Sequence, residues 1–185
     1  MALACALAPL PILYLPIVFA LYVGMEAIYL EGIYGAEPET EQLFRGFSKG
    51  SFLRYAAGMG WMCLWVLIWS LIPVAGIVFG VIKAYSYRFV PYIMLSDPEV
   101  NAFEALKRSK EMTMGYKAKM FGADAIVAAA VLVLVLVLVL LSNIDYIGVL
   151  FAIVLLAVYL AAIAFLPIFF GFVRACFYDE VEKKM

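Results

Sequence analysis

The chain has 185 residues, of which 68% are hydrophobic and 15% are charged, and its mean hydropathy is +1.05. A soluble domain of this size cannot enclose so much apolar surface, so the composition excludes an ordinary soluble protein. A formal charge of -1 provides no basic field for nucleic acid, and a sequence without histidine lacks the usual neutral-pH acid–base group and the commonest metal ligand.

Charge-free runs long enough to cross a bilayer as helices, which takes roughly 20 residues, recur along the chain. The expected spans lie at about residues 3–30, 52–71, 76–95, 122–142 and 146–173. The second and third come from one long run, which Pro73 and Gly76 divide into a tight hairpin because proline breaks a helix. We therefore predict an all-α protein, a polytopic transmembrane helix bundle with about five spans in a single domain, residues 1–185.

A charged segment follows the third expected span and is predicted to form an amphipathic helix at about residues 98–115. Asp97-Pro98-Glu99 supplies an N-cap, a proline for the first helical position and an acid in the first turn. Small and apolar residues recur at helical spacing on one side of this segment, with charged residues on the other. Two placements are open: the helix lies on the membrane surface with its lysines facing anionic lipid, or it is solvated and packs on cytoplasmic loops.

The basic residues of the loops fall on one side of the five predicted spans. They are Arg45, Lys49, Lys107, Arg108, Lys110, Lys117, Lys119, Lys183 and Lys184. Basic loops face the cytoplasm, so the prediction is a multi-pass protein with its N-terminus out, its C-terminus in and the amphipathic helix on the cytoplasmic side.

Charged residues inside the expected spans form a candidate intramembrane charge cluster. Its members are Glu26, Lys83, Arg88 and Asp124. A charge near the bilayer centre costs at least about 3 kcal/mol, so partners are expected. Counting about 1.5 Å per residue, we predict that Glu26, Arg88 and Asp124 meet, with Lys83 deeper or snorkelling. The cluster is either an ion or proton-coupled path or a salt-bridge network that fixes helix packing.

Two groups of residues on the second and third spans are candidates for packing or lipid contact. Trp61, Trp65 and Trp69 recur at (i, i+4, i+8) and form either a packing stripe or a platform for a ligand. Gly76 and Gly80 form a small-residue seam that allows another helix to approach closely, within the bundle or in a dimer.

Tyrosines near a proline form a third candidate group. They are Tyr85, Tyr87 and Tyr92, close to Pro91. Proline removes a backbone donor and opens a helix, so these residues line a polar crevice, or else the tyrosines anchor the span at the membrane interface.

Several motifs follow one another between Phe44 and Phe121. They are Leu64-Trp65 with Trp69, Ile72-Pro73 with Gly76, Lys83-Ala84-Tyr85-Ser86-Tyr87, Pro91-Tyr92-Ile93, Asp97-Pro98, and Gly115 with Lys117. In this order they resemble the bacterial domain-of-unknown-function 975 family, whereas Gly122-Ala123-Asp124 departs from its pattern. The resemblance implies an integral protein of the bacterial cytoplasmic (inner) membrane but no activity. Family members carry a further N-terminal region, and a span there would make six with both ends inside.

The sequence contains no phosphate loop, nucleophile elbow or paired-carboxylate motif, so no catalytic, cofactor-binding or metal site is expected. We expect a non-catalytic membrane protein that acts through contacts with membrane lipids or another membrane protein, and not with nucleic acid. The alternatives are a small transporter or channel that uses the charge cluster, and a lipid-related membrane enzyme. A distant likeness to membrane domains attached to some bacterial glycerophosphodiester phosphodiesterases also points to lipid-related biology.

Overall fold

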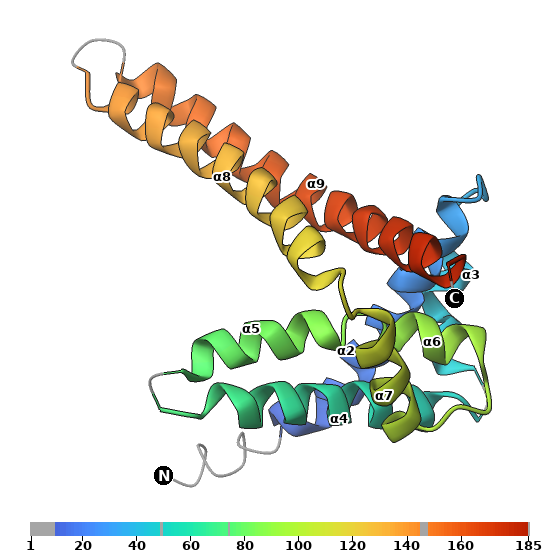
Figure 1. Ribbon diagram of the computed structural model, residues 1–185. Coiled ribbons are helices and arrows are strands. Elements are labelled where there is room, and N and C mark those ends of the chain that lie inside the picture. The colour runs from blue at the N-terminus through green and yellow to red at the C-terminus, as the bar shows by residue number, and fades with distance from the viewer. Residues whose placement is uncertain (1–9, 49, 74, 145–147, 185) are drawn as a thin grey trace, which may run out of the picture.

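The computed structural model describes residues 10–48, 50–73, 75–144 and 148–184 (Figure 1). Its helices are α2 (Leu10–Gly32), α3 (Thr40–Leu43), the 3-10 helix η1 (Phe44–Phe47), α4 (Phe52–Ser70), α5 (Gly76–Ser86), α6 (Val90–Ser96), α7 (Ala102–Met112), α8 (Lys117–Ser142) and α9 (Gly148–Glu182). These ranges contain no strand, and the predicted all-α class is confirmed.

Four helices are long and apolar enough to cross a membrane, which indicates a membrane-embedded protein. They are Tyr14–Gly32, Phe52–Ser70, Lys117–Ser142 and Gly148–Glu182. Each overlaps a predicted span, although residues 3–9 and 146–147 of those predictions lie outside the described residues. α8 begins at Lys117 instead of residue 122, and α9 continues to Glu182 instead of ending at 173, because a helix does not stop where its apolar run stops.

α4 and α5 form the predicted hairpin around Pro73. In its turn the N–H of Ala75 donates to the carbonyl of Pro73 over 2.8 Å. A Cβ atom on Gly76 would overlap the carbonyl of Ser70, and one on Gly80 would overlap the Ser70 hydroxyl. The two glycines therefore allow close packing within this hairpin, one of the two roles predicted for them.

The third predicted span is not one continuous helix, so that prediction was wrong. α5 ends at Ser86 and α6 begins at Val90, and a turn through Arg88 separates them. Pro91 explains the break, because it has no N–H and its ring clashes with the carbonyl four residues earlier, that of Tyr87. The short α6 is enclosed by protein.

α7 begins later than the sequence predicted, and its N-cap is Asn101 rather than Asp97. The Asn101 side chain accepts a hydrogen bond from the N–H of Glu104 over 2.9 Å. Asp97 instead accepts one from the N–H of Glu99 over 3.1 Å, in the turn before the helix. The buried face of α7, which packs against α4 and α6, consists of Ala105, Leu106, Ser109 and Met112. Protein therefore covers the apolar side of this segment.

Two hydroxyl groups near the end of α7 bind the backbone at the break between α5 and α6. Ser109 accepts from the N–H of Phe89 over 3.2 Å and donates to the carbonyl of Ser86 over 2.9 Å. Thr113 also donates to the carbonyl of Ser86, over 3.3 Å. Both side chains are fully buried, so they replace the helical partners that the break removes.

The hairpin of α8 and α9 extends away from the hairpin of α4 and α5, and the two diverge instead of running side by side (Figure 1). α2 packs against both α4 and α9. The core lies where α2, α6 and α9 meet, and there the ring centres of Tyr92 and Tyr178 stack 4.9 Å apart. The outer faces of both hairpins leave large apolar side chains exposed, as lipid contact requires.

Candidate functional site

Two arginine–carboxylate pairs connect the α8–α9 hairpin to the rest of the molecule. Arg88, in the turn between α5 and α6, binds Asp124 of α8 through two hydrogen bonds of 2.7 and 3.3 Å. Arg174 of α9 lies 2.7 Å from Glu26 of α2. The Glu26 side chain is fully buried, and the other three are at most 20% exposed. We call these four residues the paired cluster.

Tyrosine hydroxyls supply further hydrogen bonds to both carboxylates. Tyr85 donates to Asp124 over 2.7 Å, and Tyr92 donates to Oε2 of Glu26. Nη2 of Arg174 is close to Oε1 of Glu26 but is not aligned with it as a hydrogen bond. Within the described residues, Oε1 of Glu26 and Nε of Arg174 therefore have no hydrogen-bond partner. At this point the paired cluster has one acceptor atom and one donor group that make no hydrogen bond.

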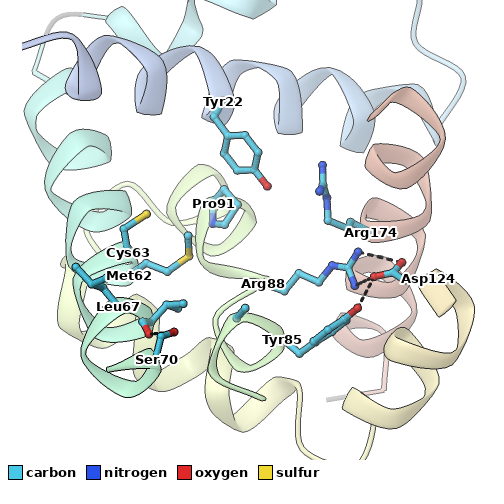
Figure 2. Close-up of a pocket in the computed structure, with 12 residues that line it drawn as sticks. Tyr22, Met62, Cys63, Leu67, Ser70, Tyr85, Arg88, Pro91, Asp124 and Arg174 are labelled. Carbon is cyan, nitrogen blue, oxygen red and sulfur yellow. Dashed lines mark hydrogen bonds and ion pairs between the residues drawn. The ribbon is translucent and has the colours of Figure 1, made fainter. Parts of the chain in front are cut away.

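A cavity of about 520 Å³, which we call the α4–α5 cavity, opens beside the paired cluster. Figure 2 shows Arg88 and Arg174 at one side of it, Met62 and Leu67 at the other, and Tyr22 between the two sides. Its remaining lining residues are Cys63, Val66, Ser70, Ala84, Tyr85, Pro91 and Asp124. The wall that α4 contributes is mainly apolar, so one end of this cavity is charged and the other is hydrocarbon-like.

A second cavity, of about 910 Å³, lies on the α8–α9 side and shares Tyr22, Arg88, Asp124 and Arg174 with the first. Most of its other lining residues are apolar and come from α8 and α9. Arg88, Asp124 and Arg174 therefore lie between two largely apolar spaces, whereas Glu26 is buried in the core.

No family model, curated protein or solved structure matches this chain. The resemblance to the domain-of-unknown-function 975 family therefore stays a prediction. The geometry of the site is what carries the functional argument.

One contact of the predicted charge cluster is present, and a cation that the sequence did not suggest accompanies Glu26. Arg88 meets Asp124 as predicted, but Glu26 is paired with Arg174 instead. Lys83, which was expected to lie deeper or to snorkel, is on α5 before the turn that carries Arg88 and makes no contact with these pairs. Its ammonium group lies 4.4 Å from the ring centre of Trp69, in a separate cavity.

The three tryptophans line that separate cavity with Lys83. Trp61 is 39% exposed, whereas Trp65 packs partly against the core. The stripe therefore contributes to packing and also forms one wall of an open groove.

The predicted tyrosine group divides among different environments. Tyr85 and Pro91 line the α4–α5 cavity, and the polar crevice predicted for this group stays a prediction. Tyr92 is fully buried beneath Glu26 and lines neither cavity beside the paired cluster. Tyr87 is buried too and lines the groove that contains Lys83.

The sequence did not suggest a role for Arg174 or Arg54, although both bind groups in other helices or loops. Arg174 directly follows the charge-free run and was taken as its end, but Gly171, Ala175 and Tyr178 continue a helical stripe past it and could have revealed it. Arg54 donates to the carbonyls of three residues at the end of α6 and in the link to α7, namely Met94, Asp97 and Val100. No local sequence pattern predicts hydrogen bonds from a side chain to backbone carbonyls so distant in sequence.

The charges of the paired cluster are already matched within the protein. Each carboxylate of the paired cluster is held by an arginine, so neither is free to act as a base toward the cavity. Among the described residues no group of three or more potential ligands could hold a metal ion. The free donors of Arg88 and Arg174 can instead bind a polar acceptor that enters the cavity.

Proposed function

We propose that this protein is a non-catalytic membrane protein that binds an amphipathic lipid in the α4–α5 cavity. The single observation that carries the proposal is the polarity of that cavity: guanidinium and tyrosine groups at one end, and apolar side chains of α4 at the other. Its volume of about 520 Å³ accommodates a polar head and the first part of an acyl chain, and ligand sites of this type are apolar with a few fixed polar groups.

The charge balance of the site selects the kind of head group. The paired cluster contains two cations and two anions, so its formal charge is zero. A head group with net charge would add an uncompensated charge to a low-dielectric site, which is unfavourable. A zwitterionic head such as phosphoethanolamine fits, because its phosphate accepts from Arg88 and Arg174 while its ammonium group faces Asp124.

The proposal includes an orientation in the membrane. Counting α5 and α6 together as a broken span gives five spans, with the N-terminus outside and α7 and the C-terminus in the cytoplasm of a bacterium, at its inner membrane. Labelling from outside with a membrane-impermeant maleimide, in a cysteine-free background, should modify Asn143→Cys and spare Lys110→Cys. The reverse pattern would overturn this orientation.

Native mass spectrometry of the purified protein with added phosphatidylethanolamine tests the binding proposal. The double variant Arg88→Gln/Asp124→Asn removes both charges without leaving either one unpaired, and it should bind about 10- to 100-fold more weakly. Ala84→Phe should weaken binding by filling the apolar part of the cavity. The matched control Ala129→Phe, on an exposed position of α8, should bind like wild type. Equal binding by all four proteins would contradict the proposal.

A small transporter is the second candidate, and the break between α5 and α6 favours it. Transporters build their sites from interrupted helices at which ionisable groups gather, and Arg88 lies at such an interruption. Flux measured in liposomes should then depend on Arg88. A wild-type protein that retains lipid but gives no flux of ions or protons would argue against transport.

A further inference from the structure

A second polar site lies on the opposite side of α5 from the paired cluster. Lys83 of α5 and Lys107 and Lys110 of α7 line a cavity of about 250 Å³ with the tryptophan stripe of α4. Tyr87, Phe103 and Leu106 complete it. We call this cavity the lysine groove. It shares no lining residue with the α4–α5 cavity.

The three ammonium groups of the lysine groove have no acidic partner in the described part of the chain. Every ion pair there involves other cations. The nearby acids of α7 are directed elsewhere, because Glu104 pairs with Arg108 and Glu111 lines a different cavity. Three like charges gathered on one cavity repel one another, and an anion relieves that repulsion.

The walls of the groove favour an anion that comes from the membrane. Trp61 and Phe103 are exposed beside the lysines, so aromatic rings border the cationic groups on an outer face of a membrane-spanning helix. A volume of about 250 Å³ is smaller than a drug-sized pocket, so it suits a head group and not a whole lipid. Leu64 and Ile68, exposed on the same helix as the tryptophans, can contact its acyl chains.

We propose that the lysine groove binds the phosphate-containing head of an anionic membrane lipid. The phosphate accepts from Lys83, Lys107 and Lys110, and the head lies against the indole rings of α4. The two sites thus differ by charge: a net-neutral lipid in the α4–α5 cavity and an anionic lipid in the groove. This second site does not depend on the first.

The test is a titration of the purified, delipidated full-length protein with phosphatidylglycerol, followed by native mass spectrometry. The triple variant Lys83→Gln/Lys107→Gln/Lys110→Gln should lose roughly 100-fold in affinity. Its matched control, Lys119→Gln/Lys183→Gln/Lys184→Gln, makes the same change in net charge elsewhere and should bind like wild type. Binding of phosphatidylethanolamine in the α4–α5 cavity should be unchanged in both.

Three results would overturn the proposal. Equal losses in the two triple variants would assign the effect to overall charge and not to the groove. Displacement of phosphatidylglycerol by an equal concentration of inorganic phosphate would assign the groove to a soluble anion. Tighter binding of an acidic peptide than of the lipid would assign it to a protein partner.

Discussion

Arg174 and Glu26 form the more buried of the two ion pairs, so the stability of the paired cluster should depend most on them. The sequence predicted that Arg88 and Asp124 meet, and the structure contains that pair. It did not suggest Arg174 as the cation beside Glu26, because Arg174 stands at the end of a charge-free run and was taken as its boundary. Which carboxylate meets which arginine depends on helix rotation and packing, and neither is encoded locally.

Arg174→Met should destabilise the protein by about 3–5 kcal/mol, because it leaves Glu26 as a buried charge without a cation. The double variant Glu26→Gln/Arg174→Met should regain most of that loss, since no uncompensated charge is left. Thermal unfolding in detergent measures both. Arg45→Met is the control, because its pair with Glu31 is largely exposed and contributes little. A double variant as unstable as the single one would show that the charge is not what matters.

At the scale of elements, the break between α5 and α6 is the feature that most shapes the site. Pro91 and the hairpin at Pro73 were both visible in the sequence, and proline chemistry predicted the second correctly. The break that Pro91 causes was not predicted as an interruption of the span. It is stabilised by Ser109 and Thr113, which are distant in sequence and supply hydrogen-bond partners for the free backbone groups. An open helix inside a membrane protein is tolerated only where such partners exist.

Ser109→Ala should destabilise the protein by about 1–3 kcal/mol, because it leaves the N–H of Phe89 buried without an acceptor. Chemical denaturation of the purified protein measures the change. Ser48→Ala removes an exposed hydroxyl that binds only the carbonyl of Arg45, so it should have little effect. Similar small effects of both substitutions would mean that Ser109 does not support the break.

The link between α6 and α7 should respond to acid through Asp97. The N–H of Glu99, and then the guanidinium of Arg108, hold the pKa of Asp97 below its ordinary value of 3.8. A lowered pKa in the folded state stabilises the fold above that ordinary value, and the contribution disappears as the pH falls through the lowered pKa. The melting temperature of wild type should therefore fall more steeply than that of Asp97→Asn as the pH falls from about 5 to about 2.

Glu99→Gln is the control for that acid response, because its carboxylate makes no ion pair among the described residues. It should keep the pH dependence of wild type. An Asp97→Asn variant with that same dependence would rule out a contribution from Asp97.

At the scale of the whole molecule, hydropathy alone predicted the helical class and the four long apolar helices. The divergence of the two hairpins was not predictable. The outward faces of α8 and α9 are similarly apolar, so hydropathy does not indicate which helix packs against them. Polar contacts decide the arrangement: Arg88–Asp124 joins the two hairpins, and Arg174–Glu26 joins α9 to α2. All of these side chains except Glu26 also line the cavities beside the paired cluster. Arg88, Asp124 and Arg174 thus serve both the structure and the proposed binding.

Photo-crosslinking in nanodiscs tests the lipid-binding claim most directly. The probe is phosphatidylethanolamine with a diazirine in one acyl chain, and peptide mass spectrometry locates the adducts. We predict that adducts concentrate on residues 62–67 of α4 and that Arg88→Gln/Asp124→Asn removes most of them. Adducts spread evenly over the exposed faces of α8 and α9, and unchanged in that variant, would contradict a lipid site at the paired cluster.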